Sequence, residues 1–461
     1  MMKAVGVCLL LALSSGTNRM LRAQTADLTV IPASARIDEP VSVRVSGLHP
    51  GQRVMLRSVM RVDSASAIVA SGVYFTDSLG VVNLERDAAR SGTYSGIEPM
   101  GLFWSGQQVP LDSLGGEDIP SSEFDPPRPY SVMITASVND TVVARTTVTR
   151  TFVAENVIEE DVRSGDVVGQ LFVPRNVSDA PVVIVLGGSE GGYESSAYQA
   201  RLLAAHGFAV FAQAYFRAPG LNEELASIPV ERVQRGIAWL RERGGISAER
   251  VAVIGSSRGT ELALLSAGLN PEVRAVIVYA TSVTTGGGLT TGGEPHREAA
   301  WTLRGQPLPV MQITPSPEAL AQFDSPDPVR LRLLFEPGLS DVQAVERAAI
   351  PVENIRADVL IISGTDDQMG PVDIAGDMLM ERLARAGHQG RRVHLKYPEA
   401  GHLIGIPFTP TALRLTPWRF AVGGSAHGYA RADADSWQQV LHFLRQSLGV
   451  AGHGQASHAE R

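Results

Sequence analysis

Gly255-Ser256-Ser257-Arg258-Gly259 carries the clearest fold signal in this chain. Residues 250–254 before it form a largely apolar run typical of a short buried strand, and residues 261–267 after it have the composition of the start of a helix. A G-x-S-x-G pentapeptide at such a junction is typical of a nucleophile elbow, in which a serine stands on a tight turn at the carboxyl edge of a sheet. We therefore predict that Ser257 is a nucleophile. Glycines are expected at 255 and 259 because side chains there would collide as strand and helix pack together.

The region around the pentapeptide, residues 155–450, alternates strands with helices. Runs of strand length occur at 182–186, 208–212, 250–254, 274–279 and 358–362. Runs that are apolar at nearly every position are typical of strands buried on both faces. Their alternation with helical stretches predicts a parallel, doubly wound sheet, and we interpret this region as one α/β domain.

Residues 27–154 have a different pattern. Residues 41–46 alternate valine with serine or arginine, which is typical of a half-buried strand. Further short runs occur at 54–59, 68–75, 81–84, 130–136 and 147–153. Short strands without a helical period predict an all-β sandwich as a separate first domain. Residues 107–129, rich in Gly, Pro, Ser and acidic residues, are expected to form a long surface loop.

Length and composition agree with two globular domains. The chain has 461 residues, too many for one ordinary core, with 44% apolar and 19% charged residues. Its formal net charge of −8 excludes a basic nucleic-acid surface, so no nucleic-acid partner is expected. The tail at 451–461 is small and polar, and we predict that it is disordered.

Residues 1–26 are predicted to be a secretory signal peptide. A positive start at Met1-Met2-Lys3 precedes an apolar run at 4–13 that is too short to span a membrane, and Ala23 and Ala26 are candidate cleavage positions. No other apolar stretch approaches 18 residues, so no integral membrane segment is expected in the mature chain. The prediction is an exported protein, periplasmic or secreted. If the segment is retained as a helix, the protein is cytoplasmic.

Cysteine and histidine usage argues against a metal or cofactor. Cys8 is the only cysteine and lies within the predicted signal, so the mature chain would have no disulfide, thiolate metal site or cysteine nucleophile. The histidines are scattered without metal-ligand spacing. We expect neither a metal nor a cofactor.

A serine nucleophile needs a histidine as general base and a carboxylate that orients it. In α/β-hydrolases these follow the serine in the order Asp or Glu, then His, each on a loop after a strand. Here Asp366-Asp367 follows the strand ending at Ile362, and His402 follows the strand at 392–397. Asp367 is preferred because the acid usually closes a G-x-x-D turn. The alternative is that the Asp pair is a solvated turn and His402 an exposed loop histidine.

Acyl transfer also needs hydrogen-bond donors for the developing oxyanion. One is expected from the backbone N–H of Arg258, the residue after the nucleophile. The second is expected from the glycine-rich loop at 187–192, where Ser189 is our first candidate and Glu190 the next. The competing interpretation of this loop, a phosphate-binding loop, lacks the Lys-Ser/Thr pair of a Walker motif.

Several strings resemble one family, the acyl-CoA thioesterases and bile acid-CoA:amino acid N-acyltransferases. They lie at residues 37–41, 94–105, 205–210, 214–216 and 397–402, so the resemblance covers nearly the whole mature chain. It implies an immunoglobulin-like sandwich followed by an α/β-hydrolase domain. It also implies that Ser257 is the nucleophile, Asp367 the acid and His402 the base, in an enzyme of acyl-CoA metabolism.

The chain departs from this family in two ways. The amino-acid transferases use cysteine as nucleophile, whereas this chain has Ser257, which favours water as the acyl acceptor. The familiar members also act inside cells, whereas this chain carries a predicted export signal. The leading hypothesis is therefore a serine hydrolase of acyl thioesters. The alternatives are an exported carboxylesterase acting on an ester without coenzyme A, and a binding protein that uses the sandwich for contact.

Overall fold

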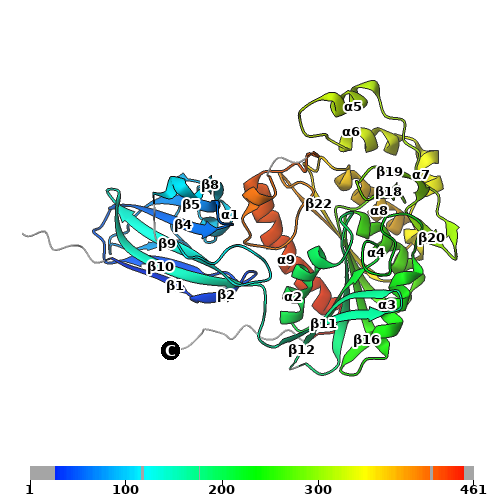
Figure 1. Ribbon diagram of the computed structural model, residues 1–461, viewed down its shortest axis with the longest axis horizontal. Helices are drawn as coiled ribbons and strands as arrows, with labels where there is room; N and C mark the ends of the chain where they lie inside the picture. Colours follow the sequence, from blue (N-terminus) through cyan, green and yellow to red (C-terminus); the bar gives the residue numbers. More distant parts are fainter. Residues whose placement is uncertain (1–25, 116–118, 176, 416–418, 451–461) are drawn as a thin grey trace, which may run out of the picture.

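The computed structural model describes residues 26–115, 119–175, 177–415 and 419–450. It has two parts, an N-terminal β-rich part and a C-terminal α/β part, which lie side by side (Figure 1). The signal peptide predicted at 1–26 lies outside the described residues except for Ala26, and so does the tail predicted at 451–461. The fold class predicted from the sequence, an α/β-hydrolase preceded by a β-sandwich, is confirmed.

The N-terminal part packs a three-stranded sheet, in the order β1-β3-β6, against a seven-stranded sheet, in the order β2-β10-β9-β4-β5-β7 with β8 beside β5. The strands are β1 (Asp27–Ile31), β2 (Ser34–Arg36), β3 (Ser42–Ser46), β4 (Arg53–Arg61), β5 (Ser66–Phe75), β6 (Val82–Asn83), β7 (Ser91–Gly92), β8 (Gln107–Pro110), β9 (Tyr130–Val138) and β10 (Thr141–Thr151). A short helix α1 (Gly101–Trp104) and a 3-10 turn η1 (Leu111–Leu114) interrupt them. The valines at 41, 43 and 45 are buried, as their alternation predicts.

The prediction of one long loop at 107–129 is wrong at its start. Residues 107–110 form β8, which pairs antiparallel with β5 from Gln107 opposite Val69 to Pro110 opposite Ser66. The β5 edge supplies the backbone partners for this segment, and a Gly- and Pro-rich composition does not reveal pairing with a distant edge.

The C-terminal part is built on one eight-stranded sheet in the order β11-β12-β14-β13-β16-β17-β22-β23. Its strands are β11 (Val157–Ser164), β12 (Val167–Pro174), β13 (Ala180–Leu186), β14 (Ala209–Ala214), β16 (Ile246–Ser256), β17 (Val273–Tyr279), β22 (Asp358–Gly364) and β23 (Arg392–Tyr397). The pairs from β14 to β23 are parallel, while β11 and β12 are antiparallel. After β13 the chain adds β14 on one side and then returns to add β16 on the other. Ligands bind at such a switch point in open α/β sheets.

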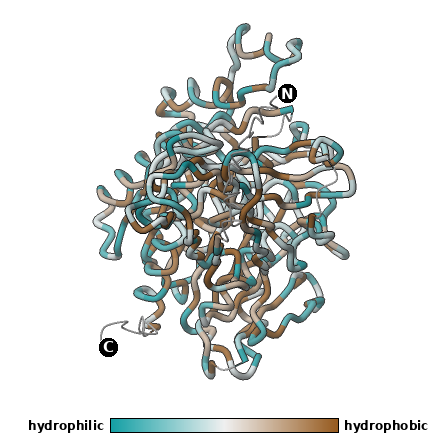
Figure 2. Tube along the Cα trace, turned by 90° about the vertical axis from the view of Figure 1, so that its left-hand side faces the viewer, coloured by the Kyte–Doolittle hydropathy of each residue, from teal (hydrophilic) through white to brown (hydrophobic). Residues whose placement is uncertain are grey.

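Helices cover both faces of this sheet. The helices are α2 (Glu194–Ala205), α3 (Glu231–Arg241), α4 (Arg258–Leu269), α8 (Val372–Arg385) and α9 (Ala426–Leu448). One apolar core contains residues of α2 and α9, and a second core on the opposite face contains residues of α3, α4 and α8. Along the Cα trace, hydrophobic residues concentrate in the interior and hydrophilic ones on the peripheral loops (Figure 2).

A long excursion between β17 and β22, residues 280–357, forms what we call the cap segment. It contains β18 (Gly287–Leu289), β19 (Pro295–Ala299), β20 (Trp301–Leu303), β21 (Gln306–Pro307), α5 (Pro317–Ala321), η2 (Gln322–Asp324), α6 (Arg332–Phe335), η3 (Pro337–Ser340), α7 (Val342–Ala348) and η4 (Val352–Asn354). Two further short elements lie outside it, β15 (Ile228–Pro229) and η5 (Thr411–Leu413). Helices α5 and α6 project at the top of Figure 1.

The two parts share a core, because residues of the sandwich and of α2 and α9 belong to one apolar cluster. At this junction the sandwich residue Asp38 is 3% exposed. Its carboxylate bonds to the ring Nε2 of His206 at 2.6 Å and accepts from the indole of Trp437 at 3.2 Å. Burial raises the pKa of Asp38, but the hydrogen bond and charge of His206, together with Arg36, hold it below its ordinary value.

Asp38→Asn should lower the free energy of unfolding by about 2 kcal/mol, because a buried ion pair loses one partner. A carboxyl with a lowered folded-state pKa stabilises the fold above its ordinary pKa and loses that effect as pH falls through the lowered value. The difference from wild type, measured by denaturant unfolding, should therefore shrink below about pH 4. Asp112→Asn, at an exposed carboxylate, is the matched control and should change little.

Candidate active site

The pentapeptide forms the turn between β16 and α4. Ser257 has φ +50° and ψ −119°, a backbone conformation that non-glycine residues rarely adopt. Its N–H donates to the carbonyl of Tyr279 at 2.9 Å, and its carbonyl accepts from the hydroxyl of Thr260 at 2.6 Å. These bonds hold Ser257 between the strand and the helix in the conformation of a nucleophile elbow.

The positions on either side of the turn have no room for a side chain, so each requires glycine. A Cβ at Gly255 would lie 2.4 Å from the carbonyl oxygen of Gly259, and a Cβ at Gly259 would lie 2.2 Å from the carbonyl oxygen of Gly187. Real Cβ atoms do not approach backbone oxygens so closely. The second contact shows that the elbow packs directly on the loop that follows β13.

The three residues predicted as nucleophile, base and acid lie in one hydrogen-bonded chain. The His402 ring bonds through Nε2 to Ser257 Oγ at 3.0 Å and through Nδ1 to Asp367 Oδ2 at 2.7 Å. A carboxylate can only accept, so Nδ1 donates to Asp367 and Nε2 is left to accept from the serine hydroxyl. The side chain of Asp367 is fully buried and that of His402 is 10% exposed.

The two candidate acids have separate roles in the structure. The second oxygen of Asp367 accepts from the backbone N–H groups of Met369 at 2.7 Å and Gly370 at 3.1 Å, so both carboxylate oxygens are occupied. Asp366 instead accepts from the N–H of Gly424 at 2.9 Å. The structure therefore brings Asp367, and not Asp366, to the histidine.

The segment at 419–424 joins the loops of Asp367 and His402, a contact that no local sequence pattern indicates. The N–H of His402 donates to the carbonyl of Val422 at 2.9 Å, and Asp367 forms a β-bridge with Gly423. The cap segment is tied to the same segment, because Val329 forms an isolated β-bridge with Phe420. Acid, base and cap are thus fixed to one another through backbone hydrogen bonds.

The environment of His402 favours its protonated form. Burial alone would lower the pKa of His402, but the charge and hydrogen bond of Asp367, with a further contribution from Glu190, raise it above its ordinary value. A histidine of this kind is stabilised as an imidazolium once it has taken a proton from the serine.

In the loop at 187–192, Gly188 packs against the serine, and the oxyanion donor expected at Ser189 stays a prediction. Ser189 is exposed, whereas Gly188 is buried, and a Cβ at Gly188 would lie 3.3 Å from the Cβ of Ser257. The hydroxyl of Tyr215 donates to the carbonyls of Gly187 at 2.8 Å and Gly188 at 2.9 Å. Arg258, the other predicted donor, begins α4 directly after the serine.

A buried network, which the sequence analysis did not find, fixes the cap segment on the nucleophile helix. Glu261, 2% exposed, accepts from the Arg258 guanidinium at 2.6 Å, from the Trp301 indole at 2.6 Å and from the N–H of Gly286 at 2.8 Å. Arg258 also donates to the carbonyl of Gly287 at 2.8 Å. The sequence feature that could have revealed this network is Glu261 itself, a charged residue within an otherwise largely apolar helical run.

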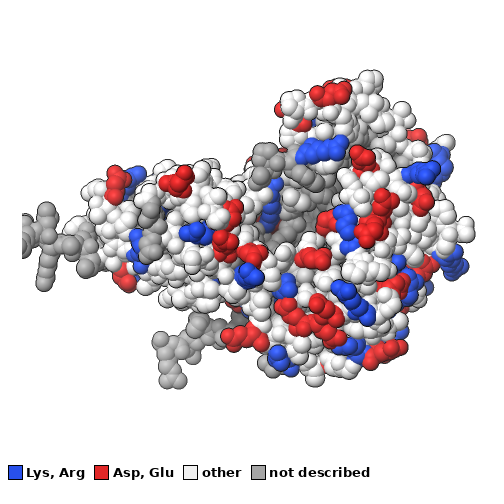
Figure 3. All heavy atoms as spheres, in the orientation of Figure 1, with Lys and Arg blue, Asp and Glu red and all other residues white. Residues whose placement is uncertain are grey.

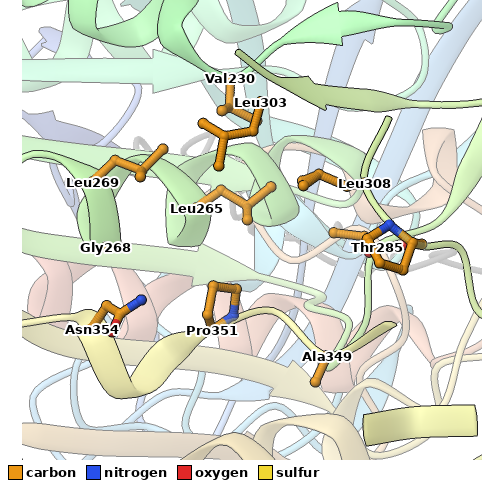
Figure 4. A pocket seen from close by; sticks show the side chains of 11 residues that line it. Val230, Leu265, Gly268, Leu269, Thr285, Leu303, Leu308, Ala349, Pro351 and Asn354 are labelled. Carbon is orange, nitrogen blue, oxygen red and sulfur yellow. Dashed lines mark hydrogen bonds between the residues drawn. The ribbon is translucent and has the colours of Figure 1, made fainter. Parts of the chain in front are cut away.

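An apolar pocket of about 80 Å³ lies at the other end of α4 (Figure 4). It is lined by Leu265, Gly268 and Leu269 of this helix together with residues such as Leu303 and Pro351. At 1.5 Å rise per residue, Gly268 is roughly 16 Å along the helix from Ser257. This pocket is therefore separate from the hydrogen-bonded chain at the serine.

The face of the molecule shown in Figure 3 carries acidic and basic side chains side by side and is hollowed between the sandwich and the projecting helices α5 and α6. Among the described residues, no three His, Cys, Asp or Glu side chains are grouped so that they could hold a metal ion. In the same ranges, no helix is long and apolar enough to cross a membrane.

An elbow serine at the switch point of this sheet, bonded to a histidine and then an aspartate, defines an α/β-hydrolase. Residues 38–164 match the family model described as the acyl-CoA thioester hydrolase/BAAT N-terminal region, and residues 228–450 match the corresponding C-terminal region. The chain belongs to this family.

Relatives are similar along almost their whole length. Acyl-coenzyme A amino acid N-acyltransferase 1 of Mus musculus is 31% identical over 438 residues, which cover 92% of this chain and 98% of that protein. Acyl-coenzyme A thioesterase 1 of Homo sapiens is 30% identical over 441 residues, covering 90% and 94%. A solved esterase of Pyrobaculum calidifontis aligns with 64% of this chain and 86% of its own at 17% identity, with a TM-score of 0.40.

Gly259→Ala should destabilise the protein by about 3 kcal/mol or more, because the new methyl group collides with the Gly187 carbonyl. Gly268→Ala is the matched control on the same helix, where the nearest atom to a new Cβ would be 3.6 Å away. It should be neutral or stabilising by up to about 1 kcal/mol. Denaturant unfolding of both variants tests this, and equal stabilities would contradict the close approach.

Proposed function

We propose that this protein hydrolyses acyl-CoA thioesters through an acyl-enzyme on Ser257. The observation that carries the proposal is the chain of hydrogen bonds from Ser257 through His402 to Asp367, at 3.0 and 2.7 Å, in a chain of this family. The thioesterase relatives support the choice of substrate class. No cofactor is needed for this chemistry.

In the first half of the reaction, the Ser257 hydroxyl attacks the thioester carbonyl carbon. Its proton passes to Nε2 of His402, and the imidazolium is stabilised by the carboxylate of Asp367. The carbonyl oxygen becomes an oxyanion, for which the backbone N–H of Arg258 and an N–H of the 187–192 loop are the expected donors. Collapse of this intermediate breaks the carbon–sulfur bond, and His402 returns the proton to the leaving thiolate.

In the second half, water replaces the thiol. His402 takes a proton from the water as its oxygen attacks the acyl-serine ester, and the proton then goes to Ser257 as the ester bond breaks. The products are a carboxylic acid, a thiol and the free enzyme. A serine at 257, where the family's transferases carry cysteine, supports water over an amine as acceptor.

The second candidate function is hydrolysis of oxygen esters by an exported enzyme. The predicted signal peptide at 1–26 favours it, because acyl-CoA is scarce outside the cell. The same residues would carry out the same steps with an alcohol as leaving group. We expect the cap segment, tied to Arg258 and Glu261, to select the acyl group in either case.

Ser257→Ala should abolish covalent labelling by a fluorophosphonate and lower turnover by about 10⁴-fold or more, because the attacking oxygen is lost. Wild type should hydrolyse acyl-CoAs faster than oxygen esters of the same chain length. Equal labelling of wild type and Ser257→Ala would contradict the nucleophile, and turnover of oxygen esters alone would favour the second candidate.

Asp367→Asn should reduce kcat by about 10⁴-fold, because the histidine loses the group that fixes its tautomer. The base must be neutral, so kcat/KM of wild type should rise with pH through a pKa above the ordinary value for histidine. In Asp367→Asn this rise of kcat/KM, the acidic limb of the pH profile, should move to lower pH. The reason is that the carboxylate charge that raises the pKa of His402 is gone. Asp366→Asn, at the neighbouring carboxylate bonded to Gly424, is the control and should retain the wild-type profile.

A further inference from the structure

The side chain of Glu190 folds back over the loop that faces the nucleophile. Its Oε1 accepts from the backbone N–H of Gly188 at 3.0 Å and from the hydroxyl of Ser195 at 2.5 Å. The catalytic steps above assign no role to this carboxylate.

Gly188 lies between this carboxylate and the nucleophile. A Cβ built on it would lie 2.7 Å from Oε2 of Glu190 and 3.3 Å from the Cβ of Ser257. The N–H that Glu190 occupies therefore belongs to the loop residue packed on the serine. Ser189, the next residue, is exposed.

A donor that serves an oxyanion must be free when the charge develops. The Gly188 N–H is instead bound to a carboxylate, and a negative charge at that point would oppose a second one on the substrate. Either this amide takes no part in the reaction, or Glu190 gives it up.

We infer that Glu190 is a positioning residue that holds the Gly188 N–H in the free enzyme and releases it to the substrate carbonyl oxygen, so that Gly188 supplies the second oxyanion donor. This inference rests on the proposed function and names a different donor from Ser189. The carboxylate belongs to an exposed residue, so its release is a side-chain rotation into solvent.

The backbone of the loop has its own supports, so it can keep its place while the Glu190 side chain moves. Tyr215 holds the carbonyls of Gly187 and Gly188. The guanidinium of Arg217 donates to the carbonyl of Glu190 at 3.0 Å and to that of Thr291 in the cap segment at 3.1 Å.

The charge of Glu190 also acts on the base. The groups that act on His402 are Asp367 and Glu190, both of which raise its pKa against the effect of burial. Glu190 is in turn near Tyr215, whose pKa is raised mainly by burial, with Arg258 and Glu261 also acting on it. Removing the Glu190 charge should therefore lower the pKa of His402.

Two variants separate the hydrogen bond from the charge. Glu190→Ala frees the Gly188 N–H and removes the charge, so fluorophosphonate labelling of Ser257 should become about tenfold faster at a pH where His402 is neutral. Glu190→Gln keeps the shape and an acceptor oxygen but not the charge. Both variants should move the acidic limb of the labelling rate to lower pH.

Ser195→Ala is the matched control, because it removes the other donor to the same carboxylate oxygen and leaves Gly188 untouched. It should shift neither the labelling rate nor the acidic limb. Labelling of Glu190→Ala at or below the wild-type rate, in a protein with wild-type thermal stability, would overturn the inference. If Glu190→Ala does not fold, labelling of Glu190→Gln no faster than wild type where His402 is neutral would overturn it, because an amide oxygen holds the Gly188 N–H less strongly than a carboxylate. A wild-type protein that is not labelled at all would instead overturn the proposed function.

Discussion

The active site depends on one close packing contact, where the start of α4 lies on the backbone that follows β13. Gly259 has no room for a Cβ beside the carbonyl of Gly187, and Gly188 has little room beside Ser257. This contact brings Ser257 to the 187–192 loop at the switch point of the sheet, where β14 and β16 lie on opposite sides of β13. The serine, the loop and the helix N-terminus are positioned together because their backbones touch.

The acid and base are fixed by a second set of backbone contacts. The strand-like segment at 419–424 binds the His402 loop and the Asp367 loop, and through Phe420 it also binds the cap segment. Rigid backbone support of this kind holds catalytic groups at their reacting distances and lowers the entropy lost on reaching the transition state. The buried pair of Arg258 and Glu261 ties the cap segment to α4, so this segment is anchored close to Ser257 in the chain.

The sandwich is part of the same folded unit, since its core runs into that of α2 and α9. Asp38 contributes a buried carboxylate to two side chains of the α/β part, and Trp104 contacts the ring of His427 near the start of α9, with centroids 5.9 Å apart. Both Asp38 and Trp104 lie within strings that carry the family resemblance. In these two strings, Asp38 and Trp104 therefore serve the contact between the sandwich and the α/β part, and neither lies among the residues bonded to Ser257.

Local sequence patterns were enough to predict the sheet, the elbow and Ser257, Asp367 and His402 as candidates, because hydrophobic periodicity and turn residues are local signals. The prediction from sequence missed β8, because pairing with a distant edge leaves no local pattern, while its choice of Ser189 as an oxyanion donor stays a prediction. Tertiary structure decided that Asp367 rather than Asp366 meets the histidine, that Gly188 packs on the serine, and that Glu190 occupies its amide. These outcomes depend on which backbones approach within hydrogen-bonding distance, and only the folded chain brings residues so far apart in sequence to the same point.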